Sequence, residues 1–335
     1  MQKQEIDNMH IAHCNLREAL LNMSNEDWIY YLISLLKLYS VSTNTNANPL
    51  YQQIQRDWHL FDNENVARDY VEGCCFLPDI QDFGFNAETK VEYSVSIQQV
   101  TKTWNDIKSV IKHKTRYHID DSPLRTQEWN SCLGDCVETI DSCKHKQYYR
   151  ARIPQTEDVH YKRSEMGAPN PAKATSGRAN PMGISYLYVC TDINTCLYET
   201  RASYLDRVSV GTFKIKSHQS VSLMNLTRVK ADKMEIPIDG DDLEGNLKIR
   251  MLINLISRDL SEPMRRHDSI VEYIPTQFIC EYIRDNYNVD GIIYTSSLND
   301  KGTNVVFFNQ DKLECVKVQD WQVNHISISG NPLHT

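Results

Sequence analysis

The chain changes character near residue 145, and this change limits the folds that it can adopt. Residues 1–145 carry 13 Lys and Arg against 21 Asp and Glu, a net charge of −8, whereas residues 146–335 carry 23 of each. Three of the 12 glycines precede the change and nine follow it. Because glycine favours turns and weakens helices, we expect two domains, a mainly helical one at 1–145 and a turn-rich one at 146–335.

Local patterns predict helices in the first part and a mixture of short strands and helices in the second. The predicted helices of the first part are Trp28–Tyr39, Tyr51–Phe61, Val66–Val71, Val100–Ile111 and Leu124–Lys144, with a strand at Val91–Ile97. In the second part the predicted strands are Tyr148–Ile153, Ile184–Val189, Val208–Ile215, Val221–Asn225, Gly291–Tyr294, Val305–Phe308 and Leu313–Val318. The predicted helices there are Ile193–Ala202, Leu243–Leu260 and Thr276–Tyr287. Many short strands with few helices predict an α+β domain on a twisted, mostly antiparallel sheet.

Composition and charge exclude several classes of protein. With 41% hydrophobic and 24% charged residues, the composition is that of a globular protein. The longest apolar run, Trp28–Tyr39, is shorter than the roughly 20 residues of a membrane span, so no membrane association is expected. The N-terminus shows no secretion signal, and a cytoplasmic location is therefore expected. A net charge of −8 argues against direct binding of nucleic acid.

The ten cysteines show no repeating spacing, which favours reduced thiols over a disulfide framework. Cys132, Cys136 and Cys143 precede His145, but we interpret them as a buried stripe on one helix rather than as zinc ligands. The same interpretation applies to His10, His13 and Cys14. No metal site and no dinucleotide-binding glycine fingerprint is expected.

A segment rich in glycine and proline is the first candidate for function. Residues 166–183 read MGAPNPAKATSGRANPMG and contain six Gly or Pro, which excludes a helix or a central strand. Arg178 follows Gly177 within this loop, and its guanidinium would suit a diphosphate. A solvated surface loop with an incidental arginine would have the same composition.

The helix after this loop carries the second candidate. Asp192 is placed to cap it, and Glu199 falls at the edge of its buried face. A carboxylate there suits an acid, a base or a stabiliser of positive charge, although an ion pair with Arg201 is the alternative. Ser296 and Ser297 follow a hydrophobic strand, where they can bind hydroxyl groups of a ligand or simply end the strand.

Six segments in order resemble the RES domain, a family named for an arginine, a glutamate and a serine. They are Tyr149-Arg150-Ala151-Arg152, Gly177-Arg178-Ala179-Asn180-Pro181-Met182-Gly183, Tyr186-Leu187-Tyr188, Tyr198-Glu199-Thr200-Arg201, Asp290 to Ser297, and Asn304-Val305-Val306-Phe307-Phe308. The resemblance covers roughly residues 147–310 and implies a fold like that of ADP-ribosyltransferases.

The resemblance also implies roles for individual residues in cleaving the nicotinamide–ribose bond of NAD. Glu199 would be the central carboxylate, Tyr188 would lie against nicotinamide, and Ser296, or alternatively Ser297, would be the serine of the last motif. Arg178, with Arg150 or Arg152, would bind the diphosphate and ribose. NAD is then a substrate, and neither a cofactor nor a metal is implied.

As a RES protein, the chain is expected to be an NAD-degrading toxin or defence effector that acts by hydrolysis or phosphorolysis. There are two alternatives. The chain could be an ADP-ribosyltransferase that modifies a protein, or a catalytically silent module that binds NAD or ADP-ribose. The resemblance implies an antitoxin or immunity protein as partner. Residues 1–145 lie outside it and are expected to regulate the enzyme or to form a homo-oligomer.

Overall fold

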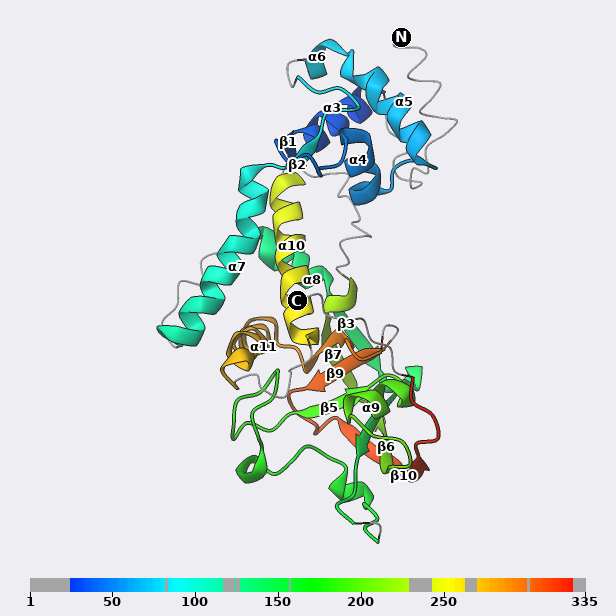
Figure 1. The fold of residues 1–335 in the computed structure, drawn as a ribbon. Coiled ribbons are helices and arrows are strands. Elements are labelled where there is room, and N and C mark those ends of the chain that lie inside the picture. The colour runs from blue at the N-terminus through cyan, green and yellow to red at the C-terminus, as the bar shows by residue number, and fades with distance from the viewer. Residues whose placement is uncertain are drawn as a thin grey trace, which may run out of the picture. The chain divides into compact units, whose positions relative to one another are not determined.

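The computed structural model describes residues 25–81, 84–116, 124, 127–156, 158–228, 243–262, 270–299 and 302–327 (Figure 1). Within the chain, two compact units are distinguished. The first comprises Met1–Asp106, Gln127–Trp129 and Val229–Asn254, and the second comprises Ile107–Thr126, Asn130–Arg228 and Leu255–Thr335. The expected domain boundary at 145/146 stays a prediction.

The first unit is mainly helical around one small two-stranded sheet. Its elements are α3 (Asn25–Leu36), β1 (Tyr39–Val41), α4 (Leu50–Trp58), α5 (Glu64–Cys75), α6 (Pro78–Gln81) and β2 (Val91–Tyr93). The division between the units falls within three further helices, α7 (Val95–His113), α8 (Gln127–Asp135) and α10 (Leu243–Ser261). No helix in the described part of the chain is long and apolar enough to cross a membrane.

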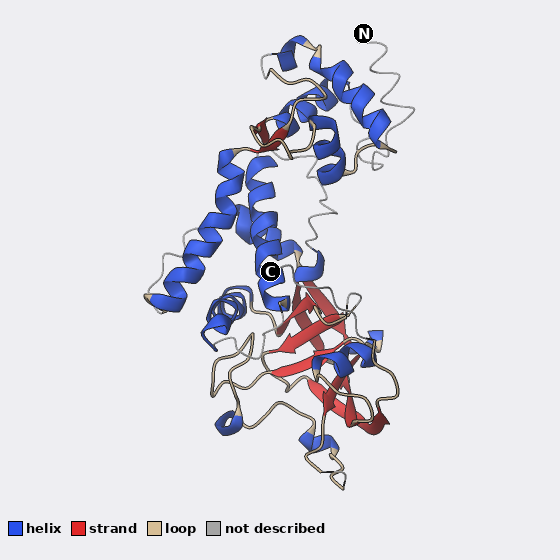
Figure 2. Cartoon of the chain, in the orientation of Figure 1, coloured by secondary structure: helices blue, strands red, loops and turns tan. Residues whose placement is uncertain are grey.

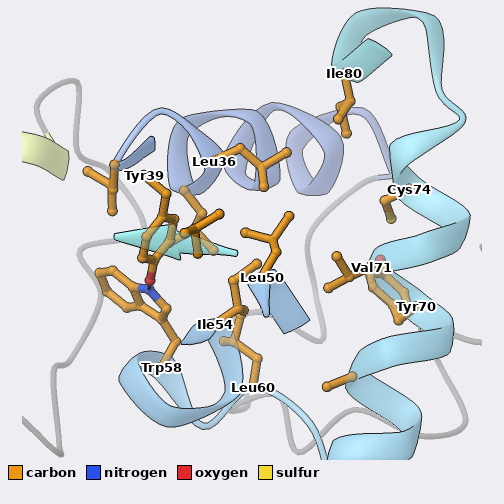
Figure 3. Packing of buried hydrophobic residues seen from close by; sticks show 14 of the residues in the cluster. Leu36, Tyr39, Leu50, Ile54, Trp58, Leu60, Tyr70, Val71, Cys74 and Ile80 are labelled. Atoms are coloured by element: carbon orange, nitrogen blue, oxygen red, sulfur yellow. Dashed lines mark hydrogen bonds between the residues drawn. The ribbon is translucent and has the colours of Figure 1, made fainter. Parts of the chain in front are cut away.

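The core of the first unit is built by the apolar faces of α3, α4 and α5, with further residues from α6 and the two short strands (Figure 3). Leu50 and Ile54 of α4 are fully buried, one helical turn apart. Trp58, a turn further on, donates its indole N–H to the Tyr39 hydroxyl at 2.8 Å. Each buried polar atom of this aromatic pair is therefore satisfied, as a dry core requires.

The second unit is organised by an eight-stranded sheet (Figure 2). Its strands are β3 (Val137–Asp141), β4 (Gln147–Arg152), β5 (Leu187–Cys190), β6 (Arg207–Ile215), β7 (Ser220–Asn225), β8 (Gly291–Thr295), β9 (Thr303–Phe307) and β10 (Leu313–Gln322). They lie in the order β10-β6-β4-β5-β9-β8-β7-β3. The pair β7–β8 is parallel and the other neighbouring pairs are antiparallel. The expected α+β class with a mostly antiparallel sheet is confirmed.

Two helices of this unit position the site described below. α9 (Ile193–Glu199) packs on β4 and β5, and α11 (Ile274–Tyr287) precedes β8. Because side chains alternate across a strand, β5 sends Leu187 and Val189 into the core cluster on one face of the sheet. Its residue Cys190 joins the cluster on the other face, which contains Cys196 of α9. The α9 face is the face that carries the site.

Most of the elements predicted from the sequence are present, with ends shifted by a few residues, and in three places part of a predicted element has a different secondary structure. The helix predicted at Leu124–Lys144 is wrong beyond α8, because Val137–Asp141 forms the edge strand β3. As a result Cys143 is exposed and does not continue the buried stripe of Cys132 and Cys136. The strand predicted at Val91–Ile97 ends at Tyr93, and α7 begins at Val95.

The helix predicted at Trp28–Tyr39 ends at Leu36, and Tyr39 begins β1. His10, His13 and Cys14 lie outside the described residues.

Gly291 provides a test of the sheet. A Cβ at this position would lie 2.2 Å from the backbone oxygen of Val306 on the neighbouring strand, so Gly291→Ala must push β8 and β9 apart. We expect this substitution to lower the free energy of unfolding by at least about 2 kcal/mol. Equilibrium urea unfolding of the full chain, followed by circular dichroism, measures the change.

Gly134→Ala is the matched control, because nothing lies within 4 Å of a Cβ built there. It sits in α8 and should be neutral or stabilising by up to about 1 kcal/mol. Equal destabilisation by the two substitutions would contradict the described packing of β8 on β9.

Candidate functional site

A cavity of about 300 Å³ lies between the sheet and α9. Its lining residues come from β4, β5, β8, β9 and α9, with Thr200 directly after α9. They are Tyr149, Arg150, Ala151, Tyr188, Val189, Cys190, Cys196, Glu199, Thr200, Tyr294 and Asn304. The cavity is found where the sheet is least continuous. Only one residue pair, Tyr149 with Cys190, joins β4 to β5, whereas six pairs join β4 to β6. Beyond that pair no further residues of β4 and β5 are paired, and residues of both strands line the cavity.

Four lining side chains form one row across the sheet. Tyr149 of β4 lies opposite Cys190 of β5, Cys190 lies opposite Asn304 of β9, and Asn304 lies opposite Tyr294 of β8. Residues directly opposite one another in a sheet share a face, with their Cβ atoms about 5 Å apart. The row therefore forms the side of the cavity made by the sheet, and α9 forms the side that faces it.

α9 begins and ends where its sequence requires. The side chain of Asp192 accepts a hydrogen bond from the backbone N–H of Thr195 at 2.8 Å and one from the Thr195 hydroxyl at 2.6 Å. This cap confirms the predicted start of the helix. Thr195 and Cys196 are buried beneath the helix, and Glu199 is its last residue. The carboxylate of Glu199 is thus placed at the edge of the buried face, as the spacing predicts.

The Glu199 carboxylate is held through one of its two oxygens. Oε1 accepts a hydrogen bond from the Ser296 hydroxyl and another from Nδ2 of Asn304, each at 2.7 Å. Oε2 accepts no hydrogen bond from the residues that the structure describes. The carboxylate is therefore fixed in orientation and keeps one oxygen for a ligand.

The partners of Glu199 are themselves oriented. Ser296 is buried, and its oxygen accepts hydrogen bonds from the backbone N–H groups of Leu298 and Asn299, each at 3.2 Å. With its acceptor side occupied in this way, the hydroxyl proton is directed at Glu199. On Asn304, Oδ1 accepts from the thiol of Cys190 at 3.3 Å, which fixes the amide so that Nδ2 faces Glu199. A hydrogen bond with Cys196, and then burial, raise the pKa of the Cys190 thiol, so it stays a protonated donor.

Tyr188 combines a place in the cavity wall with a structural contact. Its hydroxyl donates to Oδ1 of Asn180 at 2.7 Å and accepts from the backbone N–H of Ala179 at 3.0 Å. Burial raises the pKa of Tyr188 above its ordinary value, so the hydroxyl is neutral. The ring lines the cavity while the hydroxyl anchors the loop at 166–183.

The same loop is tied to the first turn of α11. Gln277 donates its amide to the backbone oxygens of Gly177 at 2.7 Å and Asn180 at 2.9 Å. The Thr276 hydroxyl donates to the backbone oxygen of Arg178 at 2.6 Å. The Arg178 backbone is therefore fixed, in agreement with its placement in a constrained loop.

The predicted site residues fall into two groups. Arg150, Tyr188 and Glu199 line the cavity, and Ser296 is bonded to Glu199. Arg150 donates to the backbone oxygens of Met166 and Gly167. Burial, together with repulsion from Arg152, lowers its pKa to about 10, so it keeps its charge at neutral pH.

The other three predicted residues do not line the cavity. Arg178 directs Nη1 to the backbone oxygen of Leu260 at 2.7 Å, in the last turn of α10. Arg152 donates to the backbone oxygen of Glu165 at 2.6 Å, and its guanidinium lies 4.4 Å from the centre of the Tyr161 ring. Ser297 is exposed. Their assignment to substrate binding stays a prediction.

Sequence reasoning did not single out Tyr294, Tyr149, Cys190 or Asn304 as site residues. Tyr294 and Asn304 stand within hydrophobic strands, where a polar side chain is the one available signal. Their meeting depends on the register of β8 against β9, which no local pattern specifies. Among the described residues, no group of three or more His, Cys, Asp or Glu could hold a metal ion.

Comparison with known proteins identifies similarity over the second part of the chain. The family model of the RES domain matches residues 147–326. Among solved structures, the chain is similar to the M. tuberculosis MbcT-MbcA toxin-antitoxin complex, with 12% sequence identity. That match covers 52% of this chain and 84% of the other, at a TM-score of 0.26, which is too low to establish a shared fold. No curated protein matches the chain.

Gly177 tests the anchoring of the loop at 166–183. A Cβ there would lie 2.6 Å from Oδ1 of Asn180 and 2.9 Å from the Tyr188 hydroxyl. Because Asn180 is buried and its side chain is bonded to the Tyr188 hydroxyl, Gly177→Ala should break this contact and release residues 175–180. We expect the backbone amides of this segment to exchange with solvent at least about tenfold faster, as measured by hydrogen exchange. Unchanged exchange, with Gly134→Ala as the control, would show that Tyr188 does not anchor the loop.

Proposed function

The chain belongs to the RES domain family, and we propose that it cleaves the nicotinamide–ribose bond of NAD. The observation that carries the proposal is the Glu199 carboxylate, which is fixed through Oε1 and open at Oε2 inside a cavity of about 300 Å³. This volume is at the lower end of small-molecule sites. It suits the reacting half of a dinucleotide whose other half lies outside.

The chemistry requires little from the protein beyond placement and charge. As the C1′–N bond breaks, its electron pair goes to the positively charged pyridinium nitrogen, and nicotinamide leaves as a neutral molecule. The ribose carbon then carries positive charge, as in glycoside cleavage. Oε2 of Glu199 supplies the opposing negative charge, and a preorganised group of this kind is worth several kcal/mol in the transition state. Water or phosphate forms the new bond to C1′, and the attacking water loses one proton.

The other lining residues support this reaction. Arg150 is charged at neutral pH and retains further guanidinium N–H groups, which can pair with phosphate oxygens. The Tyr188 ring offers a flat apolar wall for nicotinamide. The single residue pair that joins β4 to β5 supports a sheet of the ADP-ribosyltransferase type, opened to admit the dinucleotide.

The cellular role follows from the reaction. A chain that degrades NAD would act as a toxin or defence effector, and its control by an antitoxin or immunity protein stays a prediction. A homo-oligomer and a regulatory role for residues 1–145 are likewise predictions of the sequence.

Product analysis tests the reaction. Purified full chain is incubated with NAD, with and without phosphate, and the products are identified by mass spectrometry. Free nicotinamide with ADP-ribose indicates hydrolysis, and a phosphorylated ADP-ribose that forms only with phosphate indicates phosphorolysis. Recovery of intact NAD in both mixtures would refute the proposal.

Glu199→Gln should slow the reaction by orders of magnitude while keeping the fold. The amide oxygen of glutamine can still accept the hydrogen bonds of Ser296 and Asn304, but the negative charge is lost. We expect nicotinamide release to fall about 10²–10³-fold, with unchanged thermal unfolding. Glu314→Gln, at an exposed position on β10, is the matched control and should retain the wild-type rate. Wild-type turnover by Glu199→Gln would remove Glu199 from the mechanism.

Asn304→Asp tests the orientation of Glu199. A second carboxylate beside Oε1 replaces a donor by a like charge, so that protonation of the pair is favoured. Because the reaction needs the ionised form, the acidic limb of the kcat/KM profile should move to higher pH by at least about 1 unit.

Asn194→Asp adds the same charge at an exposed position of α9 and serves as the control. An identical acidic limb in Asn304→Asp and in the wild type would contradict the hydrogen bond from Asn304 to Glu199.

A further inference from the structure

Tyr294 is a buried tyrosine whose hydroxyl has no partner among the described residues. The residue is 4% exposed and lines the cavity. Its hydroxyl makes no hydrogen bond to the part of the chain that the structure describes. A hydroxyl that borders a cavity and has no partner in the surrounding protein can form its hydrogen bonds with a ligand there.

Tyr148 provides a comparison within the same sheet. Within the described ranges its hydroxyl is also unpaired, but it is sealed from solvent in the core on the face opposite α9. There its ring packs edge-on against Phe307, with 5.2 Å between the ring centres. The hydroxyl of Tyr294 is not sealed in this way, because Tyr294 borders the cavity. A ligand in the cavity can therefore satisfy Tyr294, whereas no ligand can reach Tyr148.

The register of the sheet places Tyr294 beside the carboxylate of Glu199. Tyr294 lies directly opposite Asn304, and Nδ2 of Asn304 donates to Oε1 of Glu199 at 2.7 Å. Among the described residues, neither Oε2 of Glu199 nor the hydroxyl of Tyr294 has a hydrogen-bond partner, and both side chains line the cavity next to Asn304. Any substrate that contacts Glu199 comes close to Tyr294.

The chemistry of this pair selects its ligand. A carboxylate oxygen only accepts hydrogen bonds, whereas a phenol both donates and accepts. Burial raises the pKa of Tyr294 well above its ordinary value, so the phenol keeps its proton. A phosphate group would be repelled by Glu199. Two neighbouring hydroxyls suit the pair, because one can donate to the carboxylate and the other can bond the phenol.

We propose that the Tyr294 hydroxyl binds a hydroxyl group of the nicotinamide ribose, next to the one that Glu199 holds. This inference rests on the proposed cleavage of NAD and adds a substrate contact to it. Tyr294 then positions the ribose, and C1′ comes to rest beside Oε2 of Glu199.

The experiment measures NAD binding by calorimetry, with Glu199→Gln as the parent so that NAD is not consumed. Tyr294→Phe in this parent removes one oxygen and keeps the ring, and we expect roughly 3- to 10-fold weaker binding of NAD, the effect of one hydrogen bond. Tyr148→Phe removes the sealed hydroxyl in the same sheet and should leave the affinity unchanged. Thermal unfolding of each protein confirms the fold.

NAD analogues identify the group that Tyr294 contacts. The probes are NAD molecules whose nicotinamide ribose lacks either the 2′- or the 3′-hydroxyl. The analogue that lacks the hydroxyl bound by Tyr294 should bind the parent more weakly than NAD does. Tyr294→Phe should not reduce the affinity for this analogue any further. The other analogue should still respond to Tyr294→Phe. This non-additivity is the signature of a direct contact.

Each other outcome overturns a stated part of the account. If Tyr294→Phe binds NAD as the parent does, Tyr294 is not a substrate contact, although NAD cleavage by the wild type would still stand. If the variant weakens NAD and both analogues equally, Tyr294 contacts another part of NAD and the ribose assignment is wrong. If the parent binds both analogues as tightly as NAD, neither ribose hydroxyl contributes to binding, and the assignment of Tyr294 to a ribose hydroxyl is wrong. If the parent does not bind NAD and the wild type releases no nicotinamide, both proposals fail.

Discussion

One carboxylate oxygen connects the three segments that make the site. Oε1 of Glu199, at the end of α9, accepts from Ser296 after β8 and from Asn304 on β9. Charge-assisted hydrogen bonds of this kind are stronger than neutral ones, and they fix the group that accepts them. The carboxylate is consequently preorganised before any ligand arrives. Oε1 holds both of these hydrogen bonds, and Oε2, which accepts none from the described residues, is left for a ligand.

The surrounding architecture supports this interaction from both sides. Below the carboxylate, the row from Tyr149 to Tyr294 depends on the register of four strands, and Cys190 fixes the Asn304 amide within it. Beside it, the loop at 166–183 is held by Tyr188 and by the first turn of α11. Groups held by several contacts lose little further freedom when a substrate binds, which favours catalysis by placement.

Local sequence patterns were sufficient to predict β4 to β10 and the cap of α9, since these depend on neighbouring residues. They failed at Val137–Asp141, which was predicted as part of one continuous helix at Leu124–Lys144. Val137, Thr139 and Ile140 are β-branched and favour a strand, and pairing with β7 decides the outcome. Glu199 and Ser296 were identified through the family motifs. Tyr294 and Asn304 required the sheet, because a register joins residues that are far apart in the sequence.

A crystal structure of the full-length Glu199→Gln chain with NAD tests the central claim most directly. The account predicts that the nicotinamide ribose occupies the cavity between α9 and β9, with C1′ within about 4 Å of the side chain at position 199, close to a reacting geometry. Nicotinamide would lie against Tyr188, and the diphosphate would extend towards Arg150. NAD bound elsewhere on the chain, or bound with adenine in this cavity, would contradict the account.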